Sequence, residues 1–352
     1  MRFRLTRLDV LLICALLLFS GIWVVLVRQA GPSVEKRQAI SSWHAEQTRV
    51  KENLQTTMSL GRKNLEDRIR ENPSLLKKIE LAFCAALFVM ALSLWSAIRL
   101  VYRILRGRSA HRRVGAPSPP TWTFRQIVRL FVGLLIVTQA ALLAEWAFVR
   151  SFLPKGFDPH VAALWNTLLI DAAVIVGGVL LMRRAVVNRI FSQVWMVLRF
   201  GAASYLTFLP FLGLIMLGVA QALSFFKQDP APQLVFTMYL SENRAPVLGW
   251  LLFLVTVAGP VAEEFFFRGL LYGWLRTRLG VARGLLLSSF LFAGIHGDPV
   301  VFLPIFALGL LFGWVYEQTG SLAAPIAIHV AHNGGMLYLA SLLKSILSLG
   351  HP

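Results

Sequence analysis

The chain has 352 residues, of which 57% are hydrophobic and only 15% are charged. Soluble domains carry about 25% charged residues, so this composition excludes an ordinary soluble domain and indicates a membrane protein with several spans. The formal net charge is +18. Much of the excess of Lys and Arg lies in short loops beside apolar runs, where these residues fix topology. We therefore do not interpret the charge as nucleic-acid binding.

Successive apolar runs predict an all-α fold, a polytopic transmembrane helical bundle with about eight or nine membrane helices. The runs are residues 10–27, 79–101, 127–149, 161–182, 205–226, 247–275, 284–295, 300–316 and 325–343. The run at 247–275 is too long for one perpendicular span. We expect it to tilt, to kink near Gly259 and Pro260, or to extend into the cytoplasm.

The first apolar run follows Arg2, Arg4 and Arg7, and this charge predicts a cytoplasmic N-terminus. No cleavage pattern of small residues follows cleanly, so we interpret the run as a retained signal anchor. Cys14 and Cys84 lie inside apolar runs without metal or redox spacing. We expect both to be packing residues.

Residues 28–78 are polar, with apolar residues at an imperfect spacing of three and four. This spacing predicts one or two amphipathic helices, broken near Gly61 and ended at Asn72 and Pro73. The topology puts this segment outside the cytoplasm. A solvated hairpin joining two spans and a sensing or dimerising module both fit the pattern.

Shifts in composition divide the chain into four parts. They are an N-terminal two-span module at 1–101, a basic cytoplasmic linker at 102–126, accessory spans at 127–200 and a core at 201–345. Arginines and prolines mark the linker. Residues 190–200 at the end of the third part are expected to form an interfacial segment.

Two adjacent carboxylates and a guanidinium, Glu263, Glu264 and Arg268, lie within the run at 247–275. Each charge at the centre of a membrane helix costs roughly 2.5–3.5 kcal/mol, so such groups pair, face a polar cavity or do chemistry. Glu264 and Arg268 are four residues apart and are predicted to pair on one helix face. Glu263 is rotated by about 100° and is the candidate general base or acid. A simple ion-pair lock between helices is the alternative.

Two further polar groups lie in the last hundred residues. His296 follows Phe292 at a helix end, where a lone histidine is commonly a structural hydrogen-bonding residue. His329 and Asn333 are four apart and share a helix face, with His332 between them in azimuth and expected along the same edge. A hydrogen-bonded pair between helices would also explain these residues.

Together, these residues could supply a base, an orienting imidazole and donors for an oxyanion. A water between Glu263 and His296 would attack a peptide carbonyl, and His329 with Asn333 would hold the tetrahedral oxyanion. The alternative is a zinc site built from Glu263, His296 and His329 with an open position. The chain has no HExxH helix, which weakens the metal interpretation. The first interpretation needs no cofactor and the second needs zinc.

The sequences EEFFFRG, FAGIH and HVAHN at 263–269, 292–296 and 329–333 resemble the EExxxR, FxxxH and HxxxN signature of the CPBP intramembrane proteases. This family is also called the Abi or type II CAAX prenyl protease family. The resemblance covers about residues 200–343, and it implies an intramembrane endopeptidase with a catalytic cavity within the C-terminal helices.

The resemblance also implies roles for individual residues. Glu263 would activate water with His296 assisting, and His329 and Asn333 would stabilise the oxyanion. The supporting residues would be Glu264, Arg268 and Phe292. Eukaryotic members remove the last three residues of prenylated C-a-a-X proteins. Prokaryotic members are more varied and include proteins linked to bacteriocin self-immunity.

Other classes of membrane protein fit less well. A rhomboid needs a Gly-x-Ser-Gly nucleophile, and a presenilin-like protease needs two intramembrane Asp, whereas Asp171 stands alone. A proton-coupled carrier using Glu263, Asp171 and Glu145 is disfavoured because the motifs cluster in the C-terminal third without repeats. A non-catalytic membrane-binding or bacteriocin-immunity-type protein with the same fold remains the alternative to a peptidase.

The expected partners follow from this interpretation. They are a membrane-embedded or lipid-anchored protein or peptide substrate and the lipid bilayer, with no nucleic acid. The expected location is a bacterial cytoplasmic (inner) membrane, with the N-terminus in the cytoplasm.

Overall fold

The computed structural model describes residues 6–29, 48, 52, 66–67, 69–106, 114–152, 159–191, 194–227 and 234–348. These residues form helices and connecting segments and include no strand, which confirms the predicted all-α class. Before the C-terminal core, the helices are α1 (Arg7–Gln29), α4 (Pro73–Leu105), α5 (Phe124–Phe152), α6 (Pro159–Phe191) and α7 (Val194–Phe225). The core comprises α8 (Leu234–Ser241), α9 (Ala245–Phe253), the π-helix η1 (Leu254–Ala258), α10 (Gly259–Glu264), the π-helix η2 (Phe265–Tyr272), α11 (Gly273–Gly294), α12 (Pro299–Thr319) and α13 (Ala323–Ser348).

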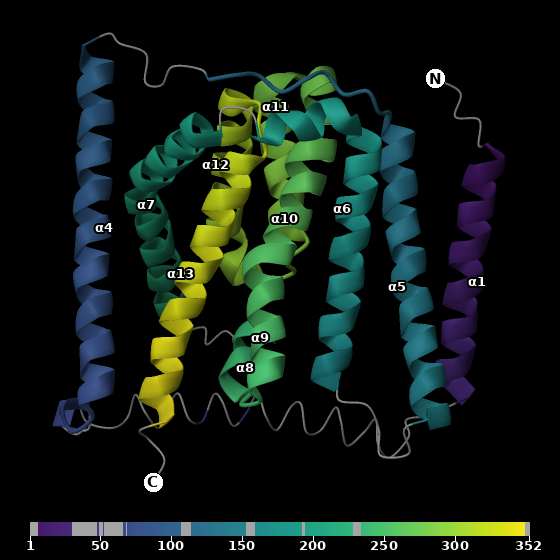
Figure 1. The fold of residues 1–352 in the computed structure, drawn as a ribbon, viewed down its shortest axis with the longest axis horizontal. Helices are drawn as coiled ribbons and strands as arrows, with labels where there is room; N and C mark the ends of the chain where they lie inside the picture. Colours follow the sequence, from purple (N-terminus) through teal and green to yellow (C-terminus); the bar gives the residue numbers. More distant parts are fainter. Residues whose placement is uncertain are drawn as a thin grey trace.

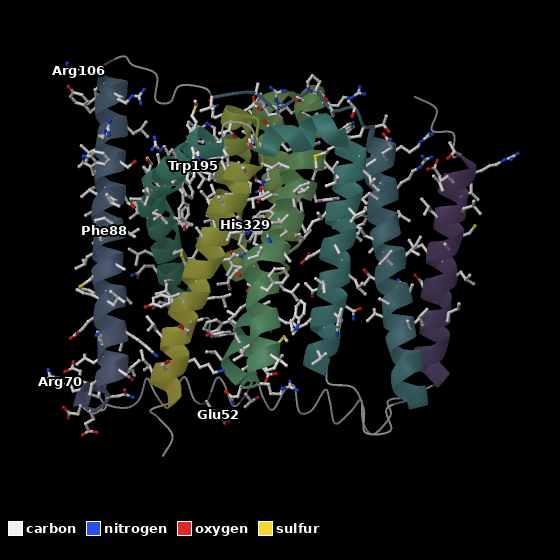
Figure 2. The ribbon with its side chains drawn as sticks, viewed as in Figure 1. Glu52, Arg70, Phe88, Arg106, Trp195 and His329 are labelled. Carbon is white, nitrogen blue, oxygen red and sulfur yellow. The ribbon has the colours of Figure 1, made fainter. Side chains whose placement is uncertain are left out.

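The long helices stand side by side, with α4 and α1 at the two edges of the bundle (Figure 1). Helix α1 packs against α5, and α4 packs against α7. Arg70 and Arg106 mark the opposite ends of α4, and His329 lies midway between the two ends of the bundle (Figure 2). The two spans of the predicted N-terminal module therefore flank the C-terminal helices. The domain boundaries stay predictions.

Within the described residues, seven helical stretches are long and apolar enough to cross a membrane. One of them, Ala245–Gly294, has 50 residues, about 75 Å of helix at a rise of about 1.5 Å per residue. This is more than twice the hydrocarbon thickness of about 30 Å. The stretch folds back at Gly280, which has φ 80° and ψ 173°, a conformation open to glycine.

The two arms on either side of Gly280 are antiparallel and in close contact. A Cβ on Gly284 would lie 3.1 Å from the backbone nitrogen of Arg276, and the Ser288 hydroxyl donates to the Phe267 carbonyl at 3.1 Å. The separate runs predicted at 247–275 and 284–295 are thus confirmed as two arms of one helical hairpin.

The described part of the basic linker packs against the C-terminal core. The backbone N–H groups of Val114 and Gly115 donate to the Gln318 carbonyl at the end of α12, at 2.9 and 3.0 Å. The buried Trp122 indole N–H donates to the Leu270 carbonyl at 3.0 Å. This segment crosses the end of the bundle above α11 and α12 (Figure 1), so the linker fixes the core as well as joining two parts.

Some local expectations were wrong. Residues 190–200 are not a separate interfacial segment, because α6 ends at Phe191 and the continuous helix α7 begins at Val194. Cys14 and Cys84 are exposed on their helices and do not pack in the core. The short helix α8 lies between the apolar runs predicted at 205–226 and 247–275, where the sequence predicted no helix.

The predicted boundary at Asn72 and Pro73 is confirmed. The Asn72 side-chain oxygen accepts from the Leu75 N–H at 3.2 Å, and Pro73 occupies the first turn of α4. Most of the predicted amphipathic helices between 28 and 78 lie outside the described residues.

Candidate active site

An irregular helix carries the motif with the two glutamates. The π-helix η1 precedes Gly259, whose N–H donates to the Leu254 carbonyl. In the same register the Val255 carbonyl would accept from residue 260, but that residue is a proline and has no N–H. The Asn333 side chain donates to this orphaned carbonyl at 2.9 Å. The irregularity expected at Gly259 and Pro260 is therefore a π turn, stabilised from α13.

Glu264 and Arg268 form the predicted ion pair in the centre of the core. Arg268 Nη1 lies 2.7 Å from Glu264 Oε1, and the two side chains are 1% and 0% exposed. Two aromatic rings also contact Arg268. Its guanidinium lies 4.3 Å from the Phe292 ring centroid and 5.2 Å from the Phe312 ring centroid. Arg268 Nη2 also donates to the Gly309 carbonyl at 3.1 Å. This set of contacts holds α10, η2, α11 and α12 together.

Phe292 connects two of the three motifs. Its ring lies under Arg268, and its carbonyl accepts from His296 Nδ1 at 2.8 Å. Because a carbonyl can only accept a hydrogen bond, His296 carries a proton on Nδ1. Its Nε2 is not used in this hydrogen bond. The spacing in FxxxH therefore has a structural reason, since the residue that supports Arg268 also orients His296.

His329 lies between the two glutamates. Its Nδ1 is 3.1 Å from Glu264 Oε1, and its Nε2 is 3.7 Å from Glu263 Oε2. The ring stacks on Phe312 at a centroid distance of 4.8 Å and an interplanar angle of 29°. A carboxylate accepts the Nδ1 proton, so the inner glutamate orients the imidazole whose other nitrogen faces the outer glutamate.

The two glutamates have different surroundings, as the sequence predicted. Glu264 is fully buried and bound to Arg268 and His329. The side chain of Glu263 is 31% exposed, and its Oε2 lies 3.7 Å from His329 Nε2. The outer carboxylate is therefore the one that a substrate or a water can reach.

His296 and His332 are placed differently from the two motif residues on α13. His296 is exposed at the end of α11, and within the described residues no direct contact joins it to Glu263. A water between them stays a prediction. The expectation for His332 was wrong, because its Nδ1 lies 3.0 Å from the Tyr205 hydroxyl on α7 and not along the edge formed by His329 and Asn333.

Within the described residues, no group of three His, Cys, Asp or Glu side chains is arranged to hold a metal ion. A zinc site formed by Glu263, His296 and His329 stays a prediction. The requirement for a cofactor stays a prediction.

Asp171 is a site residue that the sequence interpretation did not place here. It lies on α6, 9% exposed, with Oδ2 3.9 Å from the position of a Cβ on Gly259. Gly259 is one helical turn before Glu263 and on the same helix face. The sequence feature that could have indicated a role for Asp171 is its position as an acidic residue in the middle of an apolar run. The side chain of Glu145, the third acidic residue of the carrier hypothesis, lies outside the described residues.

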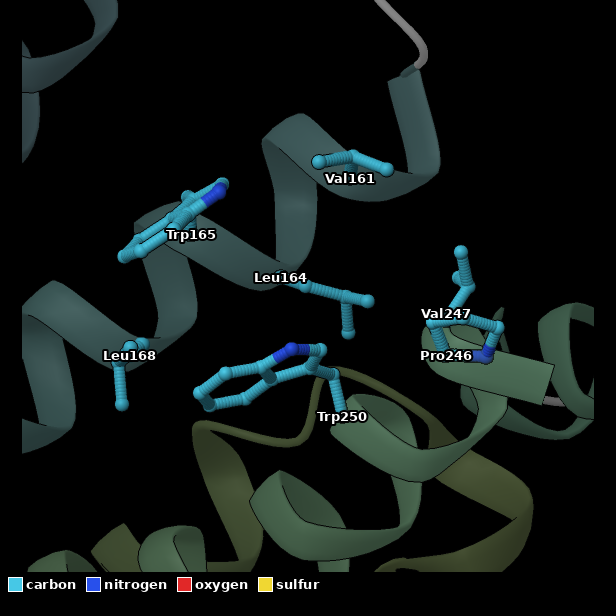
Figure 3. A pocket seen from close by; sticks show the side chains of 7 residues that line it. All are labelled: Val161, Leu164, Trp165, Leu168, Pro246, Val247 and Trp250. Atoms are coloured by element: carbon cyan, nitrogen blue, oxygen red, sulfur yellow. The ribbon is translucent and has the colours of Figure 1, made fainter. Parts of the chain in front are cut away.

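An apolar pocket lies between the first turns of α6 and α9 (Figure 3). Its lining residues are Val161, Leu164, Trp165, Leu168, Pro246, Val247 and Trp250. None of these side chains is ionisable, so this pocket has no means of its own to activate water.

Comparison with known proteins finds relatives of the segment that carries these residues. Residues 245–335 match the family described as Rce1-like, type II CAAX prenyl endopeptidase. Over 90 residues the chain is 36% identical to the membrane-embedded CAAX protease MroQ of Staphylococcus aureus (strain USA300), covering 24% of this chain and 36% of that protein. Over 99 residues it is 28% identical to the putative membrane peptidase YdiL of Bacillus subtilis (strain 168), covering 26% of this chain and 41% of that one.

The match therefore spans about two fifths of the length of these curated relatives. No solved structure matches the chain. The matched part runs from the start of α9 into α13 and contains the residues that surround Glu263 and Glu264.

Proposed function

Because this chain belongs, through residues 245–335, to the Rce1-like type II CAAX prenyl endopeptidase family, we propose that it is an intramembrane endopeptidase. It hydrolyses a peptide bond in a membrane-associated protein or peptide. The observation that carries the proposal is the difference in environment between two adjacent carboxylates. Glu264 is locked by Arg268, whereas Glu263 is partly exposed and faces His329.

Glu263 is the general base in this proposal. It takes a proton from a water, and the resulting hydroxide attacks the carbonyl carbon of the scissile peptide. The oxygen of that carbonyl becomes an oxyanion. The protonated Glu263 then donates its proton to the leaving nitrogen as the C–N bond breaks, so that one water is consumed and two chain ends are released. His296 Nε2 assists by orienting the water.

His329 and Asn333 supply the proposed donors to the oxyanion. His329 Nε2 is a donor when the ring carries both protons, with Nδ1 still bound to Glu264. The Asn333 amide has two N–H groups, and the bond to the Val255 carbonyl uses one of them. That bond holds the second N–H in a fixed direction, which is the preorganisation that oxyanion stabilisation requires.

No step of this mechanism is routed through a metal. Zinc stays the alternative cofactor of the sequence interpretation, and metal analysis of the purified protein tests it directly.

The depth of the site supports a membrane-associated substrate. Glu263 and His329 lie on stretches that are long and apolar enough to cross a membrane. Processing of a prenylated C-a-a-X terminus is one form of the reaction that the family name suggests. We propose a location in a bacterial cytoplasmic membrane with the N-terminus in the cytoplasm, which agrees with the sources of both relatives.

Substitution of the proposed base tests the function. In Glu263→Gln the amide cannot accept the proton, so we expect cleavage to fall by at least about 100-fold while the protein still folds. The inactive variant should capture its substrate in host membranes, and the captured protein identified by mass spectrometry supplies the cleavage-site sequence. Glu80→Gln is the matched control, because Glu80 is exposed on α4.

Two results would contradict the proposal. If Glu263→Gln cleaved at the wild-type rate, Glu263 would not be the general base. A cellular function that survives the combined change of Glu263 and His296 to Ala would favour the alternative, a non-catalytic binding or immunity-type protein.

A further inference from the structure

Asp171 is a buried carboxyl that the proposed mechanism leaves unexplained. It sits in the middle of α6, within the apolar stretch Ala163–Met182, and is 9% exposed. Among the described residues its Oδ2 has no hydrogen-bond partner. A buried polar atom without a hydrogen-bond partner destabilises a protein by about 1–3 kcal/mol. Ionisable residues inside membrane helices are commonly functional.

The packing of α6 directs Asp171 towards the two glutamates. Helix α6 packs against α10 and against both π-helices that flank it. Leu164, Leu168 and Asp171 follow each other at spacings of four and three, so Asp171 continues the face that lines the apolar pocket with Trp250 (Figure 3). Further along α6, a Cβ on Gly178 would lie 3.2 Å from the ring of Phe265.

Gly259 lies beside Asp171. A Cβ there would lie 3.9 Å from Asp171 Oδ2. Glu263 is one helical turn later on the same face, and helical side chains lean towards the preceding turn. Glu263 therefore lies on the face of α10 that Asp171 adjoins at Gly259.

We propose that Asp171 is a further catalytic residue, which binds the water that Glu263 activates. This inference rests on the proposed function. A water has two O–H groups and each carboxyl offers an accepting oxygen, so Glu263 takes one O–H and Asp171 takes the other. The lone pair of the water oxygen is then aimed at the substrate carbonyl instead of at either carboxyl.

The proton balance of the reaction is unchanged by this second contact. Glu263 removes the proton that it faces, the oxygen forms its bond to the carbonyl carbon, and the other O–H stays bound to Asp171. An accepting oxygen is present whether the Asp171 carboxyl is charged or neutral. The role of Asp171 is therefore orientation of the nucleophile, and Glu263 keeps the role of base.

The neighbouring cationic side chain and imidazole are bound to other partners. The guanidinium of Arg268 is bound to Glu264 and to the Gly309 carbonyl, and His329 lies between the two glutamates. Glu263 is the group whose charge acts on Asp171. Asp171 also lies outside the matched region 245–335, so the family match itself does not assign it.

The test compares two replacements of Asp171 in the full-length protein. The substrate is a quenched fluorescent peptide copied from the cleavage site of the protein captured by Glu263→Gln. Asp171→Leu removes the accepting oxygen at similar size, and we expect kcat to fall by about 100-fold with KM within about twofold. Asp171→Asn keeps an accepting oxygen, so kcat should stay within about tenfold of the wild type.

A polar residue on the same helix provides the control. Thr167 is exposed, and its hydroxyl donates to the Ala163 carbonyl within α6. Thr167→Val should cleave at the wild-type rate. If Asp171→Leu does not give a monodisperse protein, Asp171→Ala replaces it.

Two outcomes overturn the inference while leaving the proposed function standing. They are wild-type kcat in Asp171→Leu or Asp171→Ala, and an Asp171→Asn protein that is as inactive as the apolar variant. A wild-type protein that cleaves nothing overturns the inference together with the proposed function.

Discussion

The buried pair of Glu264 and Arg268 gives the sharpest test of how the core is held together. Arg268→Met keeps a long apolar stem but removes the guanidinium. It therefore removes the ion pair at 2.7 Å and the hydrogen bond to the Gly309 carbonyl. Glu264 is 0% exposed, so the remaining carboxylate has no access to water that could replace its partner.

The size of the effect follows from this burial. Removing one partner of a buried ion pair destabilises a protein by about 3–5 kcal/mol, because an uncompensated charge is left behind. Removing both charges avoids that cost. The double variant Glu264→Gln with Arg268→Met keeps an accepting oxygen for His329, and we expect it to recover at least half of the loss. The two substitutions should thus be strongly non-additive.

Equilibrium unfolding in mixed micelles measures the free energies of the wild type, both single variants and the double variant. Arg278→Met is the matched control, since Arg278 is exposed on the same hairpin arm, and it should stay within about 0.5 kcal/mol of the wild type. A loss below about 1 kcal/mol in Arg268→Met would refute the reasoning. So would a double variant whose loss equals the sum of the single losses, because the pair would then not be coupled.

Two further substitutions test the irregular helix and the hairpin. Asn333→Leu leaves the Val255 carbonyl without its donor, so the same unfolding assay should show a loss of about 1–3 kcal/mol. An unchanged stability would mean that another group satisfies this carbonyl. Gly284→Ala puts a Cβ 3.1 Å from the Arg276 backbone and should cost about 1–3 kcal/mol. Gly294→Ala, where a Cβ meets nothing within 4 Å, is the control, and equal effects at the two glycines would contradict the close packing.

The sequence predicted much of the candidate site because its signals are local. Glu264 and Arg268 lie four residues apart, and helical geometry alone places them on one face. The same geometry separates Glu263 from them. The cost of charge in an apolar run identified the motif before any contact was known. The runs of apolar residues likewise predicted the helices, since each run is close to the length that a membrane requires.

Other features depend on contacts between distant segments. His332 is only three residues after His329 on the same helix, but α7 supplies Tyr205 as its partner. The role of Asn333 at the π turn depends on a carbonyl 78 residues earlier in the chain. The periodicity of either segment could not predict this hydrogen bond, because it forms only when α13 packs against η1.

The amino-acid sequence by itself determined that this is a helical membrane protein whose three motifs carry the unusual charges. Burial in an apolar environment makes such charges costly, so their positions are informative without coordinates. Helical spacing predicted the pair of Glu264 and Arg268, whereas only the tertiary structure decided the other partners of these charges. It placed Glu264 between Arg268 and His329, left Glu263 within reach of water, and brought Asp171 from α6 to the same place. The physical reason is that hydrogen bonds and ion pairs act over a few ångströms in space, whatever the separation along the chain.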